Sequence, residues 1–281
     1  MKEHISRVCS KMLVWNVILR AYWVYKAPKM FFESNFPIRI LDYKLQDLPY
    51  VNEIIFKCAH RIKSLNSDVK EHIPDSVVRM MTRLEEFVVL CRSNERCWRN
   101  FATMMKGNKE HLRKLEIYQF DGIAFRYLDG KCCYKKLTTL KVENGIKECY
   151  DLNYSKFEWS RLVDLINQCP NITHVNLGSV LIQDAMIDPS IKIKDLRVRL
   201  TYNSNSANVV KFLMSCKESL KHVTIVVESD IDIFKAEWFL PKVEKVKVVY
   251  WPKATTYTRM GMKHHFNDYF EYIVKHAYQI Y

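Results

Sequence analysis

Glycine is scarce in this sequence, at 6 of 281 residues. Loops that cradle phosphates and turns that bind dinucleotides need several glycines at fixed spacing, and no GxGxxG, GxxxxGKS/T or GxSxG pattern occurs. The zinc-protease pattern HExxH is absent as well. These absences argue against common nucleotide-dependent enzymes, serine hydrolases and metalloproteases. We therefore expect a protein that is not an enzyme and has no cofactor or metal.

The cysteines lack the spacing of a disulfide or zinc framework. There are 9 of them, an odd number, and no CxxC pair occurs. A disulfide framework usually has an even set of cysteines in a short secreted chain, and a structural zinc site usually has paired close ligands. We therefore expect reduced thiols and a protein of the cytoplasm or nucleus.

Long hydrophobic runs are missing. The most apolar stretch, residues 12–25, is interrupted by Asn16 and Arg20. It is shorter than the ~20 residues that a membrane-spanning helix needs. No small-residue cleavage site of a signal peptide follows it. We therefore expect no membrane partner.

Positive charge is in excess but is not concentrated in one run. Lys and Arg number 44 and Asp and Glu number 31, so the formal net charge is +13. A charge of this sign favours acidic partners, which include nucleic acids and acidic protein segments. No run of Lys and Arg is long enough to form a nucleic-acid-binding arm. A solubilising surface with no partner is the simpler interpretation.

The chain does contain a repeat. Its unit is LxxLxL, where L is any apolar residue, and the last two apolar positions alternate with polar ones as in a strand. Seven copies occur in order, and an eighth, weaker copy begins at Ile62 and Leu65. The apolar positions are Leu84, Phe87 and Val89; Leu112, Leu115 and Ile117; Leu137, Leu140 and Val142; Ile172, Val175 and Leu177; Ile193, Leu196 and Val198; Leu220, Val223 and Ile225; and Val243, Val246 and Val248.

Two of the stretches between these segments have helical periodicity. Within residues 157–169 and 207–216, apolar residues recur near one helical face. They are Phe157, Leu162, Leu165 and Ile166 in the first stretch, and Val209, Val210, Leu213 and Met214 in the second. A repeated strand–helix unit buries its apolar face only against its neighbours. The sequence therefore predicts an α/β solenoid, with parallel strands on its concave face and helices on its convex face.

These segments are similar to the LxxLxL half of a leucine-rich repeat. Cys58, Cys169 and Cys216 lie three or four residues before a leading apolar residue, where the cysteine-containing class of such repeats has CxxL. A free cysteine behaves there as a small hydrophobe, so we expect these thiols to be packing residues. The Asn or Cys that follows LxxLxL in the family is replaced throughout, which predicts an irregular array. The residues at that position are Arg92, Phe120, Gly145, Val180, Thr201, Glu228 and Trp251.

The N-terminal region resembles part of an F-box. Within residues 5–19, the matching positions are Ser6, Arg7, Val8, Cys9 and Lys11. The resemblance implies an F-box/leucine-rich-repeat protein, the substrate receptor of an SCF-type cullin–RING ubiquitin ligase. The repeats would then hold the substrate, and a partial or divergent box would hold the adaptor. The adaptor contacts that it implies are Val8, Cys9, Leu13 and Trp15.

We divide the chain into three parts on this basis. Residues 1–54 are predicted to form a helical N-terminal segment, residues 55–250 the leucine-rich repeats, and residues 251–281 a C-terminal cap. The cap is predicted to be a helix over 264–281. Its expected apolar side consists of Phe266, Phe270, Ile273 and Ala277.

The predicted binding surface is the outward side of the strands. Side chains alternate along a strand, so the positions between the buried ones face outward. The later strands are rich in basic residues there, which predicts a docking site for an acidic or phosphorylated protein segment. The residues that we single out are Lys114, Glu116, Tyr118, Lys141, His174, Asn176, Arg197, Arg199, His222, Lys245 and Lys247.

Three alternatives to a ligase receptor stay open at this point. A repeat scaffold with no ligase link would have the same strands but would not bind the adaptor. A nucleic-acid-binding protein would use the basic surface and would lose affinity steeply with salt. We rank it lower because aromatic and basic residues are not interleaved on the outward strand positions. An enzyme ranks last.

Overall fold

The computed structural model describes twelve internal segments and one single residue of the chain. They are 15–19, 38–43, 59–68, 75–90, 95–118, 128, 132–143, 152–178, 182–184, 186–200, 206–227, 244–250 and 270–274. These residues form an α/β fold with parallel strands. The chain divides into two compact units, Met1–Leu137 (unit 1) and Thr138–Tyr281 (unit 2).

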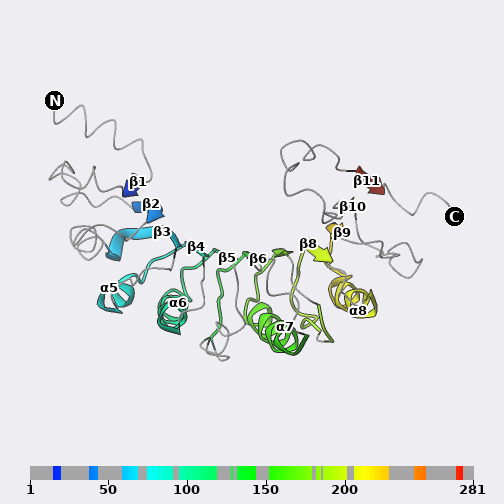
Figure 1. The fold of residues 1–281 in the computed structure, drawn as a ribbon, viewed down its shortest axis with the longest axis horizontal. Coiled ribbons are helices and arrows are strands. Elements are labelled where there is room, and N and C mark those ends of the chain that lie inside the picture. Colours follow the sequence, from blue (N-terminus) through cyan, green and yellow to red (C-terminus); the bar gives the residue numbers. More distant parts are fainter. Residues whose placement is uncertain are drawn as a thin grey trace, which may run out of the picture. The chain divides into compact units, whose positions relative to one another are not determined.

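Unit 1 consists of five described strands, each parallel to the next one in sequence. Parallel neighbours need a crossover connection, and α6 provides it between β4 and β5. Helices α5 and α6 lie on the same side of the strands (Figure 1). The elements are β1 (Trp15–Leu19), β2 (Ile38–Tyr43), η2 (Ala59–Arg61), β3 (Ile62–Asp68), α5 (Asp75–Met80), β4 (Glu86–Leu90), α6 (Glu95–Gly107) and β5 (Lys114–Tyr118).

Unit 2 continues the same plan. Strands β6 to β10 pair in sequence order and are parallel, and β11 adds to β10 in the antiparallel sense. Helices α7 and α8 again lie on one side of the strands (Figure 1). The elements are β6 (Thr139–Glu143), α7 (Leu152–Asn167), β7 (His174–Gly178), β8 (Asp195–Leu200), α8 (Ser206–Cys216), β9 (His222–Val227), β10 (Lys245–Tyr250) and β11 (Phe270–Val274).

The repeat predicted from the sequence coincides with these strands. In all seven segments the strand begins two residues after the leading apolar residue, as at Leu84 and Glu86. The three apolar side chains of the first six segments are all buried. The side chains of the seventh lie outside the described residues, and the weaker eighth copy at Ile62 and Leu65 is buried in β3. The LxxLxL spacing therefore marks both the strand and its buried side.

The cysteines before the strands pack as predicted. Cys169 and Cys216 are buried, and the Sγ of Cys169 lies 3.0 Å from the carbonyl oxygen of Leu165. Their backbone carbonyls accept the N–H groups of the leading residues Ile172 and Leu220, at 3.1 and 3.2 Å. The thiol therefore occupies the tight turn between a helix and the next strand. Cys58 lies outside the described residues.

Asn108 takes the place of such a cysteine after α6, which the sequence analysis missed. Its carbonyl accepts the N–H of Leu112 at 2.9 Å, as the carbonyls of Cys169 and Cys216 do for their own leading residues. The Asn108 side chain is buried and bonds back to the preceding repeat. It accepts the N–H of Leu84 at 2.7 Å and donates to the carbonyl of Met81 at 2.6 Å. The sequence does contain a signal for this role, because Asn108 lies four residues before the leading residue Leu112, as Cys216 does before Leu220.

Both terminal predictions need correction. Residues 1–54 were expected to be helical, but β1 and β2 lie within them. Residues 264–281 were expected to be a helix, but Phe270–Val274 forms β11 against β10. Both regions contain short runs rich in aromatic and branched residues, such as FEYIV, which favour strands. The corrected C-terminal element covers the edge of β10, which would otherwise present unpaired backbone groups.

Helix α8 lies where it was predicted, but its buried side is rotated. Val209 and Leu213 are buried as expected, whereas Val210 is half-buried and Met214 is 37% exposed. Phe212 and Cys216 are buried instead.

Helix α7 begins earlier than predicted, and among its expected core residues Leu162, Leu165 and Ile166 are buried. Phe157 has no described side chain. Among the described helices, none combines the length and apolar character needed to cross a membrane.

Candidate functional site

The outward strand positions alternate with the buried ones, as predicted. In β5 and β6 every outward side chain is half-buried and every inward one is buried. In β7 the sequence of positions is exposed His174, buried Val175 and half-buried Asn176. This alternation presents a polar strand face in each unit.

In unit 1 the predicted site residues are brought together but pair with one another. Glu116 Oε1 lies 2.7 Å from Lys114 Nζ, and its Oε2 accepts a hydrogen bond from the Tyr118 hydroxyl at 2.6 Å. The Glu116 side chain is only 15% exposed between these partners. On the same side, Ser64 donates to Glu86 at 3.1 Å. The charges here largely satisfy each other, which makes this face a weak candidate for binding a charged partner.

In unit 2 the strand register aligns residues whose side chains carry hydrogen-bond donor groups. Asn176 of β7, Arg197 of β8 and Thr224 of β9 are neighbours across the sheet. Lys141 of β6 extends the line next to Asn176, and Lys247 of β10 extends it next to Thr224. We call these five residues the donor row. Lys247 is placed by its backbone only, since its side chain lies outside the described residues.

Among the described side chains of the donor row, Arg197 is the exposed one. It is exposed, and it makes no ion pair or side-chain hydrogen bond with another described residue. Lys141, in contrast, lies 3.1 Å from Glu143 Oε1. Gly178, opposite Glu143, leaves room for this pair, because a Cβ there would come within 2.7 Å of Glu143 Cγ. Among the described cations of the donor row, Arg197 is therefore the one most available to an anionic ligand.

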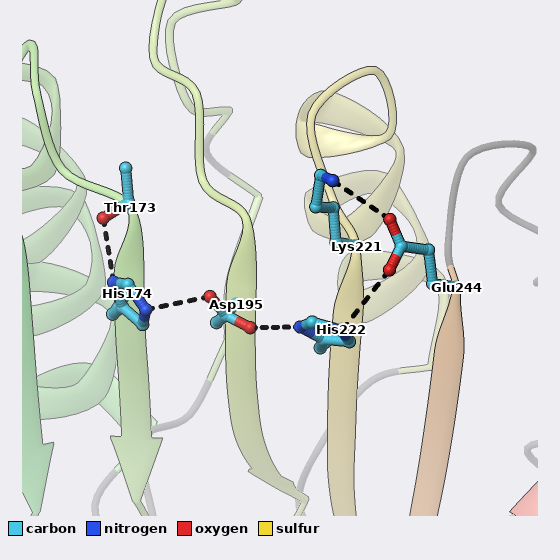
Figure 2. A network of polar contacts seen from close by, with 6 residues as sticks. All are labelled: Thr173, His174, Asp195, Lys221, His222 and Glu244. Atoms are coloured by element: carbon cyan, nitrogen blue, oxygen red, sulfur yellow. Dashed lines mark hydrogen bonds and ion pairs between the residues drawn. The ribbon is translucent and has the colours of Figure 1, made fainter.

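A second line of polar side chains crosses the starts of the same strands. Imidazoles and carboxylates alternate along it (Figure 2). His174 Nε2 lies 2.9 Å from Asp195 Oδ2, and His222 Nδ1 lies 2.5 Å from Asp195 Oδ1. His222 Nε2 lies 3.7 Å from Glu244 Oε2. We call His174, Asp195, His222 and Glu244 the histidine row.

Two more side chains complete this network at its ends. Thr173 Oγ1 lies 2.8 Å from His174 Nδ1, and Lys221 Nζ lies 3.0 Å from Glu244 Oε1 (Figure 2). The hydrogen bond from Lys221 lowers the pKa of Glu244, and the positive charge of Lys221 lowers it further. Glu244 therefore stays ionised into the acidic range. The predicted site did not include Thr173, Asp195, Lys221 or Glu244.

Backbone hydrogen bonds hold the strand starts in line. The carbonyl of Thr173 accepts the N–H groups of Lys194 and Asp195 at 2.8 and 3.0 Å. The carbonyl of Lys194 accepts those of Lys221 and His222 at the same two distances. Each shared carbonyl thus binds the last residue before the next strand and the first residue of that strand. This pattern places the first outward side chains of β7, β8 and β9 next to one another.

The histidine row does not have the geometry of a metal site. The two imidazoles belong to strands that are two apart, about 10 Å, so one ion cannot bind both nitrogens. Consistently, no group of three or more His, Cys, Asp or Glu residues in the described part of the chain could hold a metal ion.

A hydroxyl, an imidazole and a carboxylate contact one another in the order of a catalytic triad at Thr173, His174 and Asp195. Their surroundings, however, do not suit catalysis. The His174 side chain is 56% exposed, and Asp195 is shared with His222. A catalytic triad acts in a water-excluded site with donors aimed at a developing oxyanion. The exposed row is better suited to binding than to acyl transfer.

Several predicted site residues lie apart from these rows or outside the described side chains. Arg199 is half-buried, one position further along the outward side of β8 than Arg197. Lys245 pairs in register with His222, but its side chain is not described. Of the predicted adaptor contacts, Trp15 begins β1 instead of lying in a helix. Val8, Cys9 and Leu13 lie outside the described residues.

Comparison with family models and with curated protein sequences identifies no relative. No family model matches the chain, and no curated protein matches its sequence. The geometry of the strand face in unit 2 is therefore the basis for assigning a function.

Proposed function

We propose that this protein is a non-enzymatic recognition module that binds an acidic or phosphorylated segment of a partner protein on the strand face of unit 2. The observation that carries the proposal is the exposed Arg197, which has no described ion-pair partner and lies in register between Asn176 and Thr224. An arginine with polar donors on both sides is suited to carboxylates and phosphates.

The chemistry of the donor row supports this choice of partner. A guanidinium presents donors in a planar fork that matches carboxylate and phosphate oxygens, and such charge-assisted hydrogen bonds contribute about 1.5–3 kcal/mol each. Asn176 and Thr224 lie about 5 Å away on the neighbouring strands, within reach of the other oxygens of the same ligand. The formal net charge of +13 favours the approach of anions in general.

The repeated strand–helix plan supports a leucine-rich-repeat type of solenoid as the scaffold. Seven strands begin at the same step after a leading apolar residue, and neighbouring strands within each unit are parallel and pair in chain order up to β10. Solenoids of this kind present their strand side as an extended binding surface. On this proposal the donor and histidine rows lie on the concave side.

A link to a cullin–RING ubiquitin ligase is a separate part of the proposal. It depends on the F-box resemblance of residues 5–19, and the strand at Trp15–Leu19 departs from the helix of that family. Co-expression with the F-box adaptor, followed by size exclusion, tests it. A stable complex supports a substrate receptor, and separate elution of two folded proteins leaves a recognition module without a ligase link.

The recognition proposal is tested with a rhodamine-labelled decapeptide of aspartate and fluorescence anisotropy at pH 7.5. Arg197→Glu should weaken binding about tenfold or more, since it replaces a cation with a repelling carboxylate. Lys109→Glu is the matched control, because Lys109 is exposed in unit 1 and the substitution changes the net charge equally. Equal loss in both variants would contradict a specific site at Arg197.

A further inference from the structure

The histidine row places titratable groups beside the proposed anion site. Each oxygen of Asp195 faces one imidazole, and the far nitrogen of His222 faces Glu244. Asp195 and Arg197 are alternate residues on the same side of β8, about 7 Å apart along the strand. An anion bound at Arg197 would therefore be close to the charges of this row.

The groups around the two imidazoles come from five strands. On β6, Thr139 is in register with His174, and Lys141 lies two positions further on. Asp195 lies between the imidazoles, with Lys194 before it and Arg197 after it. The remaining neighbours are Thr173 beside His174, Lys221 before His222, and Glu244 just before β10. Lys245, the first residue of β10, is in register with His222, but its side chain lies outside the described residues.

The charge of the network depends on the protonation of its two histidines. Asp195 and Glu244 contribute −2 and Lys221 contributes +1, so the network of these groups carries −1 while His174 and His222 are neutral. Protonation of both imidazoles changes the total from −1 to +1. Histidine is the side chain that ordinarily changes its charge between pH 5 and 8.

We propose that protonation of His174 and His222 strengthens the capture of acidic segments at Arg197, so that this face binds its partner more tightly in mildly acidic than in neutral solution. The inference rests on the proposed function and adds its regulation. At neutral pH the Asp195 carboxylate repels an anion that approaches Arg197. Imidazolium groups on both sides of Asp195 cancel that repulsion.

The accessibility of the row suits such a response. The side chains of His174 and His222 are 56% and 48% exposed, so protons and ligand both reach them without unfolding. Two charges added at about 7–10 Å from a ligand in water-exposed surroundings should tighten binding about fivefold.

The test measures the affinity of the rhodamine-labelled aspartate decapeptide at pH 7.5 and 5.5 and at constant ionic strength. The wild type should bind about fivefold more tightly at pH 5.5, and His174→Gln/His222→Gln should lose most of this gain. His60→Gln/His111→Gln is the control, since it removes two exposed imidazoles from unit 1. A gain that persists in His174→Gln/His222→Gln, or that disappears equally in the control, overturns the inference.

A second variant checks the role of Asp195 without removing a histidine. Asp195→Asn should bind the peptide about two- to threefold more tightly than wild type at pH 7.5, because the repelling charge is gone. Unchanged affinity overturns the inference. If Arg197→Glu fails to weaken binding, the proposed function itself is wrong. If Arg197→Glu weakens binding but the histidine variants keep the full pH response, only the regulation is wrong.

Discussion

Asn108 shows what one buried polar side chain contributes to this fold. It satisfies the N–H of Leu84 and the carbonyls of Met81 and Met104, at 2.7, 2.6 and 2.8 Å. Cysteine at the equivalent place in later repeats fills space, and the Cys169 thiol contacts the Leu165 carbonyl of its own helix, whereas the Asn108 amide ties its helix to the start of the preceding strand. A buried backbone group that loses its partner costs about 1–3 kcal/mol.

Asn108→Ala should therefore lower the free energy of unfolding by about 3 kcal/mol, because several buried backbone groups lose their hydrogen-bond partner and a small cavity is left. Asn167→Ala is the control, because Asn167 at the end of α7 makes one exposed hydrogen bond, to the N–H of Asp188. That variant should lose less than about 1 kcal/mol. Urea unfolding measures both. Equal losses would contradict the structural role given to Asn108.

The thiols before the strands should be chemically inert in the folded protein. Burial raises the pKa of Cys216 to about 11, with a smaller opposing effect from its contact with Ser215. Because the folded-state pKa is the higher one, this contribution to stability is complete below the pKa of an exposed thiol. It is lost as the pH rises towards 11.

Iodoacetamide at pH 8 should therefore label the exposed Cys133 and spare Cys169 and Cys216 until the protein is unfolded in urea. Peptide mapping by mass spectrometry assigns each label. Rapid modification of Cys216 in the folded state would show that its thiol is not buried as described.

At the scale of elements, helix α8 shows that the apolar spacing within one helix does not fix which of its sides is buried. Its limits could be predicted from the sequence, but Phe212 is buried and the expected core residue Met214 is partly exposed. The reason is a tertiary contact: Phe212 packs edge-on against Trp159 of α7, with ring centroids 5.1 Å apart. An aromatic pair between consecutive helices of unit 2 decides the rotation, and spacing within one helix does not reveal it.

Phe212→Ala should reduce stability by about 3–5 kcal/mol, the usual cost of removing a buried aromatic ring. Met214→Ala, two positions away on the same helix, should cost less than about 1 kcal/mol because Met214 is partly exposed. Thermal and urea unfolding compare the two variants. A larger loss for Met214→Ala would support the originally predicted face.

The strands were easier to predict than the termini for a physical reason. Six LxxLxL segments bury all three apolar positions, so the pattern and the tertiary structure agree. Near the N-terminus, Val17 pairs with Ile40, which pairs with Leu65, so these residues occupy one position in successive strands. Val14, Val17 and Leu19 have the repeat spacing too. Short apolar runs fit helix and strand periodicity alike. The F-box resemblance favoured a helix, whereas residues 15–19 form a strand.

At the scale of the whole molecule, the two units use their outward charges differently. In unit 1 the outward charges of β5 pair within their own strand, around Glu116. In unit 2 Arg197 is exposed between polar neighbours, and a titratable row lies beside it. The outward residue types could be predicted from strand alternation. The pairing between them depends on register across strands, which sequence spacing does not fix.

The central claim is that anionic segments bind on the strand face of unit 2. NMR titration of the deuterated, 15N-labelled protein with the unlabelled aspartate decapeptide maps the contact directly. The largest shifts should fall on the amides of β7, β8 and β9 and on the Arg197 side chain, with small changes in β4 and β5. Shifts spread evenly over both units, or concentrated in unit 1, would contradict it.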